Sequence, residues 1–545
     1  MAERRRMFYN DDGDTCLAQY RGGVREEMAT DAVDTLLGTP VTTLVYCVSY
    51  SDTGNYPSQV ISRLGWRELG GEEVAGRNDG PPLATVRYWA EHGWDVPAMI
   101  MARAAEKGLE FIPSMRMNDA HFCQTAHPRV NRLTGRFWLE NQDLIITPNL
   151  EWRPERWPTF VLDFRHEKVR AFRLANADEI IARYGAQGFE MDWTRHYRFF
   201  ADGRAQPDLI TDMVRRVRRR LDARGGGRRL PLIVRVAGSV GGSLAIGLDV
   251  GAWVREGLVD YIVPSDPTRQ ISPEMPVAEW IDLVRGSGVE VHPSPESCSW
   301  RGGGEATLEM YRAAASNYYA QGAHGVYLYN VFTEGLPLQG WQYVMMRDVS
   351  CPEALARTDK TFFAIAARGD AVRALYPWRR PAALLPIRLV PGGEPAVTGL
   401  WVGDDLAAAA RASTLGRAAL RVRLSDLGPG DRLEVSLNGR PLDLAAARLG
   451  TADYRARRRS GRRGATAAPH YRAWSGLSAT LRWNLADPEG AGLRRGDNAV
   501  SVRWCLAEGA DPAERARAGE REMWLLDVDL AVCYDPLGKD PPPWG

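Results

Sequence analysis

The sequence predicts an α/β protein in which a (β/α)8 TIM barrel is followed by an antiparallel β-sandwich. Up to about residue 375, eight short apolar runs alternate with segments of helical periodicity. After about residue 395, apolar and polar residues alternate, and Asn438-Gly439 marks a hairpin turn. We therefore expect a catalytic barrel over residues 1–377, a linker or edge strand over 378–396, and a jelly-roll-like sandwich over 397–545.

Runs rich in β-branched and aromatic residues predict the eight barrel strands. In chain order they are Met7–Asn10, Thr42–Tyr50, Leu109–Met115, Gly188–Trp193, Leu230–Ala237, Val259–Val263, Val289–His292 and Gly325–Asn330. Helical segments are expected at Arg25–Leu37, Ala84–Lys107, Glu167–Tyr184, Asp208–Leu221, Val250–Glu256, Val277–Val284 and Ala306–Ala320, with a last helical region up to about Leu375. A doubly wound open sheet is the alternative, but the GxGxxG fingerprint and the GxxxxGK[ST] loop are both absent from the sequence.

Alternating residues predict the strands of the sandwich at Leu420–Leu424, Arg432–Leu437, Leu477–Asn484, Ala499–Cys505 and Met523–Cys533. An arginine-rich run, Arg455–Arg463, lies between two of them. We interpret this run as a surface loop, and binding of an anionic polymer is the alternative.

Composition excludes several classes of protein. Sixty-nine basic against 68 acidic residues give a net charge of +1, which disfavours a globally basic nucleic-acid binder. The sequence contains no apolar run of about 18 residues, so no membrane helix is expected. The seven cysteines form no CxxC pair, which argues against a structural zinc site. No apolar segment follows the charged start, so the sequence as written predicts a cytoplasmic protein, or a secreted one if the N-terminus is processed.

In a barrel, the reacting groups lie at the carboxyl ends of the strands. The polar residues at or just past these ends are Asp11, Asp12, Asp14, Tyr50, Asp52, Arg116, Asn118, His121, Glu190, Asp192, Arg195, His196, Arg235, Asp266, His292, Glu296, Tyr329 and Asn330. Carboxylates dominate this set and are interleaved with cations, so we expect an acidic site. No cofactor is expected, and a cation near Asp11, Asp12 and Asp14 is left open.

The segment 188–193 (GFEMDW) is the most informative motif for the site. Glu190 and Asp192 are two residues apart, so in a strand they share a face and point into the barrel near its mouth. Buried acids are costly unless they are hydrogen-bonded or paired with cations, and Arg116, Arg195 and Arg235 are available. The alternative is a purely structural ion-pair network.

Three segments resemble the glycoside hydrolases of the hydrolase-like TIM-barrel superfamily. Leu162–Arg170 matches an LDxxxxxVR segment, 186–193 matches a DGxxLD strand, and 114–119 (SMRMND) matches the end of the third strand. The chain departs from the pattern with Gln187 before Gly188 and with Glu190 before the aspartate. The resemblance implies a glycosidase-type barrel with Asp192 as a catalytic carboxylate. Residues 435–442 (VSLNGRPL) and 525–534 (LLDVDLAVCY) resemble the jelly-roll modules that accompany such barrels.

Glycoside cleavage needs an acid for the leaving oxygen and a carboxylate acting as base or nucleophile. Asp192 supplies one of them. Glu296 is the first candidate for the other and Asp266 the second, while Glu190 is the further acid of the motif. Substrate binding is assigned to Asp12, Arg116, Asn118, His121, Trp193, Arg195, His196, Arg235, His292, Trp300, Tyr329 and Asn330. The 18 tryptophans suit stacking on sugar rings, and Trp138, Trp152 and Trp157 are further candidates for it.

Other functions are weighed against this prediction. A catalytically inactive carbohydrate-binding barrel is the main alternative. A metal-dependent hydrolase is disfavoured because none of the eight histidines forms a His-x-His motif. A serine hydrolase is disfavoured because Ala237–Gly241 lacks the first glycine of the nucleophile elbow. The partner expected is a carbohydrate substrate, and the sandwich is expected to extend the cleft or to mediate a homo-oligomer.

Overall fold

The fold is that of a computed structural model that describes residues 5–13, 30–50, 52–63, 88–119, 135–146, 161–201, 205–266, 270–299, 304–329, 331, 338–366, 384–428, 430–453, 477–506 and 520–534. The chain divides into two compact units. The first comprises Met1–Pro267, Val277–Ser294 and Ala323–Ser350, and the second comprises Thr268–Pro276, Pro295–Gly322 and Cys351–Gly545.

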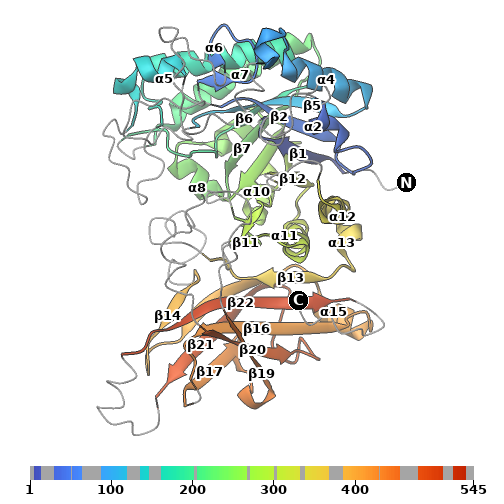
Figure 1. The fold of residues 1–545 in the computed structure, drawn as a ribbon, viewed down its shortest axis with the longest axis vertical. Helices are drawn as coiled ribbons and strands as arrows, with labels where there is room; N and C mark the ends of the chain where they lie inside the picture. Colours follow the sequence, from blue (N-terminus) through green and yellow to red (C-terminus); the bar gives the residue numbers. More distant parts are fainter. Residues whose placement is uncertain are drawn as a thin grey trace. The chain divides into compact units, whose positions relative to one another are not determined.

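The first unit is built on eight parallel strands, one at each predicted position (Figure 1). They are β1 (Met7–Asp11), β2 (Thr43–Ser49), β5 (Glu110–Arg116), β6 (Phe189–Asp192), β7 (Leu232–Ala237), β8 (Tyr261–Ser265), β9 (Glu290–Val291) and β12 (Val326–Leu328). Their order in the sheet is β12-β1-β2-β5-β6-β7-β8-β9, and the short strands β3 (Thr53–Gly54) and β4 (Ser62–Arg63) extend it beside β2.

Backbone hydrogen bonds join the chain at β9 and the chain at β12, the two ends of this strand order. The amide of His324 donates to the carbonyl of Val291 over 3.0 Å, and the amide of Tyr327 donates to that of Pro293 over 3.1 Å. The segments at the two ends of the sheet therefore lie side by side.

Helices of the first unit pack against the strands, with α4 and α6 on β5, α8 on β7 and α10 on β9. The helices are α2 (Asp31–Asp34), α4 (Val96–Glu106), α5 (Arg136–Glu140), α6 (Glu167–Tyr184), α7 (Pro207–Gly225), α8 (Val240–Ala245), α9 (Val250–Arg255), α10 (Val277–Val284) and α12 (Gly340–Val349). Pro97 lies in the first turn of α4, where a missing amide hydrogen costs nothing, and Asp95 caps that turn. No helix in the described part of the chain is long and apolar enough to cross a membrane.

An apolar cluster lies on one face of the parallel sheet. It contains one residue from each of several strands, namely Phe8, Val45, Ile112, Ile233, Val263 and Tyr327, together with Tyr329. All of these side chains are buried. Strand β6 places Glu190, in place of an apolar residue, on this face, in register with Ser114 of β5 and Ile233 of β7.

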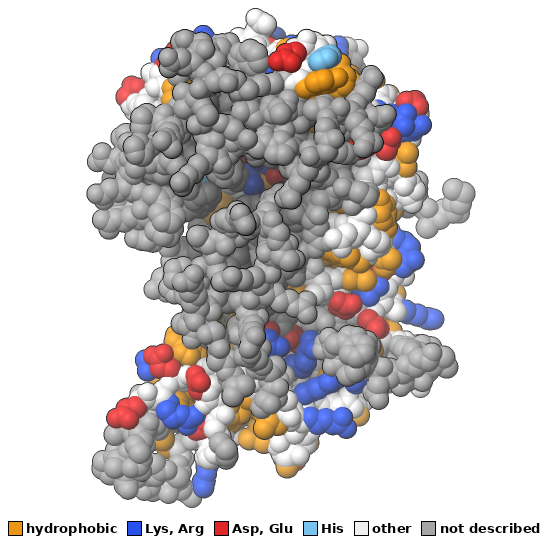
Figure 2. Space-filling view, in the orientation of Figure 1, with side chains coloured by type: hydrophobic (Ala, Val, Ile, Leu, Met, Phe, Trp, Pro, Cys, Tyr) orange, Lys and Arg blue, Asp and Glu red, His pale blue; other side chains and the backbone are white. Residues whose placement is uncertain are grey.

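The second unit contains two antiparallel sheets, in the orders β13-β22-β16-β20-β19, with β14 beside β22, and β15-β21-β17-β18. The strands are β13 (Lys360–Phe363), β14 (Ile387–Leu389), β15 (Ala396–Val402), β16 (Arg417–Ser425), β17 (Arg432–Leu437), β18 (Arg440–Pro441), β19 (Arg448–Asp453), β20 (Leu477–Asn484), β21 (Gly496–Cys505) and β22 (Met523–Cys533). The unit also holds the hairpin β10 (Cys298–Ser299) and β11 (Gly304–Glu305), and the helices α11 (Leu308–Ala320), α13 (Pro352–Leu355) and α15 (Leu406–Arg411). Basic side chains gather on its visible surface (Figure 2).

Alternating side chains of both antiparallel sheets form one hydrophobic cluster. Leu420 and Val422 of β16 are fully buried in it, as are Leu400 of β15 and Val500 of β21. This period of two is the signal by which five of these strands, β16, β17, β20, β21 and β22, were predicted.

The prediction of a helical region up to about residue 375 is wrong at β13. Residues 360–363 form a strand paired with β22, and Phe362 enters the cluster of the second unit. The strand has only four residues, too few for the alternation to stand out from a helical pattern. Helix α11, expected among the barrel helices, packs on β13 within the second unit.

The Asn438-Gly439 hairpin occurs as predicted, between β17 and β18. Leu437 and Arg440 are register partners, and the two turn residues have φ of 51° and 79°. Positive φ at both central positions is the geometry of the hairpin turn that Asn-Gly favours.

We expect Gly439→Ala to lower the free energy of unfolding by about 1 kcal/mol, because an L side chain is strained at positive φ. An added Cβ would meet no atom within 4 Å, so the loss measures backbone strain alone. Urea denaturation measures it. Gly450→Ala, in β19 without a positive φ, is the control and should leave the stability equal or higher. Equal losses in both variants would contradict this reading of the turn.

Candidate carboxylate site at the edge of the parallel sheet

Asp192, the last residue of β6, is held by donors from two directions. Its side chain is 2% exposed. The amide and hydroxyl of Thr194 donate to Oδ1 over 3.0 and 3.2 Å. Nη1 of Arg235 lies 3.1 Å from Oδ1 and 3.2 Å from Oδ2. Among the described residues, Oδ1 thus has three contacts and Oδ2 has the single contact from Arg235.

Arg235, the register partner of Asp192 on β7, connects four parts of the sheet. Its Nε donates to the hydroxyl of Ser265, at the end of β8, over 2.9 Å. Its guanidinium lies 3.6 Å from the centre of the Tyr329 ring, one residue after β12. An ion pair and a stacked aromatic ring together stabilise the buried guanidinium.

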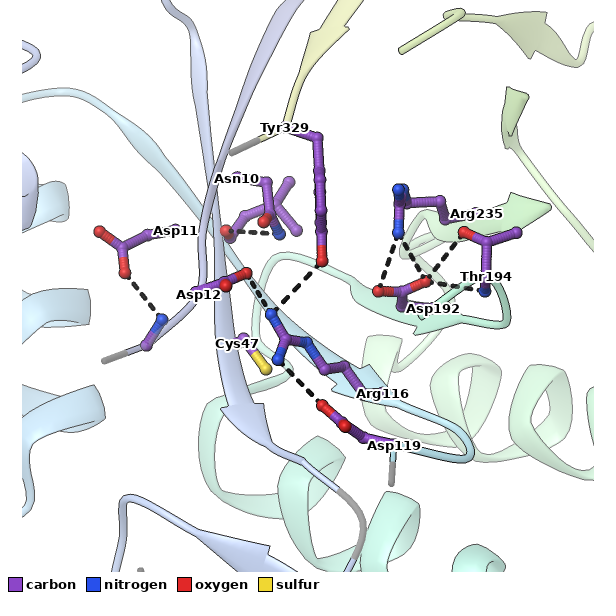
Figure 3. A network of polar contacts seen from close by, with 12 residues as sticks. Asn10, Asp11, Asp12, Cys47, Arg116, Asp119, Asp192, Thr194, Arg235 and Tyr329 are labelled. Carbon is purple, nitrogen blue, oxygen red and sulfur yellow. Dashed lines mark hydrogen bonds and ion pairs between the residues drawn. The ribbon is translucent and has the colours of Figure 1, made fainter. Parts of the chain in front are cut away.

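Arg116, at the end of β5, forms a second charged cluster beside the first (Figure 3). It pairs with Asp12 after β1 and, over 2.9 Å, with Asp119. The other oxygen of Asp119 lies 3.3 Å from Nδ1 of His196. Burial lowers the pKa of His196, although Asp119 opposes the shift.

Tyr329 joins the two clusters. Its hydroxyl lies 3.3 Å from Nη2 of Arg116, while its ring stacks under Arg235. Figure 3 shows the ring edge-on between the two, with its hydroxyl pointing at Arg116. Arg195 lies over the same ring at 5.9 Å and is 9% exposed. The side chains at the ends of β1, β5, β6, β7 and β12 thus form one connected polar network.

Glu190 lies one step below Asp192 on the same face of β6 and is completely buried. The hydroxyl of Tyr327 donates to its Oε1 over 2.7 Å. Burial and the negative charge of Asp192 raise the pKa of Glu190 to about 7. The two acids of the motif therefore differ, since one is ion-paired and the other holds its proton readily.

Two residues predicted to bind substrate are engaged elsewhere. The side-chain amide of Asn118 makes three hydrogen bonds to backbone groups, two with Leu162 and one with Arg198, and so connects two loops. Trp193 is fully buried among the rings of Phe164, Phe199 and Trp253.

The side chain of His292 lies near the amino ends of the parallel strands, whereas Asp192 lies at their carboxyl ends. Its Nε2 is 2.8 Å from Glu290 at the start of β9, and its ring packs edge-on against Phe8 and Tyr261. Both of those aromatic residues are near the amino ends of their strands. The strand-end pattern placed His292 at the carboxyl edge, but its side chain points back along the strand.

The two candidates for a second acid fall in different units. Asp266 follows Ser265 at the end of β8, in the first unit, and is 2% exposed. Glu296 is completely buried and belongs to the second unit. His121, Trp300 and Asn330 lie outside the described residues, as do Asp14, Trp152, Trp157 and the run 455–463.

Four residues of the network were not among the predicted site residues, namely Asp119, Thr194, Ser265 and Tyr327. Asp119 could have been found, because it follows Arg116 by three residues within the quoted segment 114–119. Thr194 and Ser265 sit directly beside predicted residues, but a single hydroxyl carries little signal. Tyr327 was indistinguishable from a core aromatic residue.

A cation at the acidic end of β1 was left open by the sequence. In the structure Asp11 accepts a hydrogen bond of 2.7 Å from the amide of Gly13, and Asp12 pairs with Arg116. The described residues contain no group of three or more histidine, cysteine or acidic side chains placed to hold a metal ion.

The chain is a mixed α/β protein with a parallel sheet and separate antiparallel sheets. No family model and no curated protein sequence matches it. Among solved structures it is similar to a cycloisomaltooligosaccharide glucanotransferase from Paenibacillus sp., at 8% identity and a TM-score of 0.34 over 96% of this chain. The chain spans 57% of the length of that protein.

Two further solved structures are similar in chain trace. One is the PgaB (BpsB) glycoside hydrolase domain from Bordetella bronchiseptica, at 11% identity and a TM-score of 0.38, over 64% of this chain and 99% of that one. The other is an alpha-amylase from Geobacillus thermoleovorans, at 10% identity and a TM-score of 0.36, over 92% and 98%. Likeness at this level carries no argument about activity, which has to come from the residues of the site.

Glu190→Gln is expected to change how stability depends on pH. The folded state raises the pKa of Glu190 from 4.5 to about 7, so its stabilising contribution is full below pH 4.5 and is lost as the pH rises toward 7. Gln cannot titrate, so the variant should lose less free energy of unfolding between pH 5 and 8 than the wild type. Denaturant titrations at both pH values measure this. Glu279→Gln, on the exposed face of α10, should keep the wild-type loss, and an unchanged loss in Glu190→Gln would refute the assignment.

Proposed function

We propose that the chain is a glycoside hydrolase acting on a poly- or oligosaccharide, with its reaction centre at Asp192. In this proposal the eight parallel strands close into a (β/α)8 barrel, which the hydrogen bonds of His324 and Tyr327 across the ends of the sheet support. The second unit is then an accessory domain of jelly-roll-like sandwich form. The proposal includes membership of the hydrolase-like TIM-barrel superfamily of glycoside hydrolases, which the three segments of the sequence analysis resemble.

The asymmetry of the Asp192 carboxylate is the observation that carries this proposal. Thr194 and Arg235 hold the group in one orientation through their contacts with Oδ1. Oδ1 is fully engaged, whereas Oδ2 accepts only from Arg235 among the described residues. A carboxylate oxygen has room for further contacts, so Oδ2 can act as nucleophile or base toward an anomeric carbon or a water molecule.

The second carboxylic acid is proposed to be Asp266 or Glu296. Asp266 has the support of position, because it adjoins Ser265, which is hydrogen-bonded to the same arginine as Asp192. Glu296 has the support of complete burial, as expected for an acid that is shielded from bulk water. Arg116, Arg195 and His196 are proposed to bind sugar hydroxyls.

A catalytically inactive carbohydrate-binding protein is the second candidate. It is favoured by the contact of Arg235 with both oxygens of Asp192, which leaves neither oxygen without a partner. A measurement of glycan turnover decides between the glycoside hydrolase and the inactive binding protein.

Asp192→Asn should lower kcat on a cleaved glycan by about 10³-fold or more while sparing its binding, because the amide cannot serve as nucleophile or base. The assay is the release of reducing ends from a panel of polysaccharides, with binding followed by calorimetry. Asp212→Asn, which breaks an exposed pair with Arg216 on α7, is the matched control and should retain full activity. A wild type that binds glycans and cleaves none of the panel would leave the inactive binding protein as the function.

Asp266→Asn and Glu296→Gln are expected to separate the two candidate acids. The true proton donor should show a large loss on substrates with poor leaving groups and a small loss on activated aryl glycosides, because an activated leaving group needs little protonation. The other variant should lose similar activity on both substrate types. If neither variant discriminates between the leaving groups, both assignments are wrong.

A further inference from the structure

One face of the six-stranded antiparallel sheet carries a row of arginines. Leu420 and Val422 of β16 point into the hydrophobic cluster, so Arg421 between them lies on the opposite face. Its register partner on β20 is Arg482, and the register partner of Arg482 on β19 is Arg448. Arg421, Arg482 and Arg448 thus form one row across three neighbouring strands, which we call the arginine row.

The positive charge of this row is only partly balanced. Arg421 is paired with Asp529 of β22. Of the described residues, none forms an ion pair or hydrogen bond with the side chain of Arg448 or Arg482. Burial lowers the pKa of Arg482, and the nearby charges of Arg417, Arg421 and Arg448 lower it further. The local field is therefore strongly positive, and Figure 2 shows basic side chains gathered on this unit.

Such a row opposes folding. Like charges directly opposite one another destabilise a sheet, and strands are only about 4.8 Å apart. A guanidinium cannot relieve the repulsion by losing its proton at ordinary pH. Arg448 is exposed, so packing in the protein interior does not explain why an arginine occupies this position. A bound anion would turn the repulsion into attraction.

We propose that the arginine row binds an acidic polysaccharide, with sugar carboxylates paired to the guanidinium groups. The planar fork of arginine matches a carboxylate in two parallel hydrogen bonds. The strand spacing of about 4.8 Å differs from the repeat of about 3.4 Å that each strand of duplex DNA has along the helix axis. Trp524 lies on the same face, since its neighbours Met523 and Leu525 enter the cluster, and it offers a ring for stacking.

The choice of a glycan as the ligand rests on the proposed function, whereas the sign of its charge rests on the arginine row alone. The site lies wholly within the second unit and does not involve Asp192. Binding at the row and cleavage at Asp192 can therefore be measured separately.

The test compares binding of polygalacturonate by the full chain, by Arg448→Ser/Arg482→Ser and by a matched control. The double variant should bind about tenfold or more weakly, with a shallower dependence on salt, because two ion pairs are lost. Arg411→Ser/Arg432→Ser, on α15 and β17 away from the row, removes the same net charge and should bind like the wild type. The arginines of residues 455–463 are present in every protein, so their contribution stays constant.

Three results would overturn the proposal. They are equal binding by the double variant and the control, binding of neutral dextran as tight as that of polygalacturonate, and equally tight binding of DNA through the same two arginines. Thermal unfolding at low salt guards against misfolding, because relief of repulsion should leave the melting temperature of the double variant equal or higher. Loss of cleavage in Asp192→Asn with unchanged polygalacturonate binding would support both proposals independently.

Discussion

The ion pair between Arg235 and Asp192 is the interaction on which the carboxyl edge of the parallel sheet depends. Both side chains are 2% exposed, and a buried charge without a partner is strongly destabilising. Arg235 also needs Ser265 and the ring of Tyr329, so the ends of β6, β7, β8 and β12 have to converge. The geometry of the site is thus fixed by a requirement of folding, before any substrate is present.

The same charge sets the state of Glu190 beneath it. One arginine balances one carboxylate, so a second negative charge at Glu190 would have no counter-ion of its own in the described layer. Tyr327 donates a hydrogen bond to Glu190, which offsets only part of the cost of burial. Glu190 is accordingly the acid of this network whose charge responds to pH near neutrality.

Periodicity in the sequence was enough to place the eight strands of the parallel sheet and the two acids of β6, because both depend on local spacing. Residues 188–193 needed only the alternation of a strand to put Glu190 and Asp192 on one face. The partners of these acids could not be predicted uniquely, because three arginines were available and only the register makes Arg235 the neighbour of Asp192. Asn118 and His292 show the same limit, since each has a polar side chain at a strand end that folding directs to backbone groups or to Glu290.

Arginine is used in two opposite ways in this protein, and the contrast bears on function. Arg116 and Arg235 are buried, and each is matched by at least one carboxylate and by an aromatic ring, so neither has charge to spare for an anionic ligand. Arg448 and Arg482 face one another with no carboxylate partner among the described residues, so their charge is available to a ligand. The carboxyl edge of the parallel sheet is therefore a neutralised centre in which Oδ2 of Asp192 accepts only from Arg235 among the described residues, whereas the arginine row of the second unit keeps a net positive charge. The proposed cleavage at Asp192 and the proposed anion binding at the arginine row thus rest on opposite uses of the same residue type.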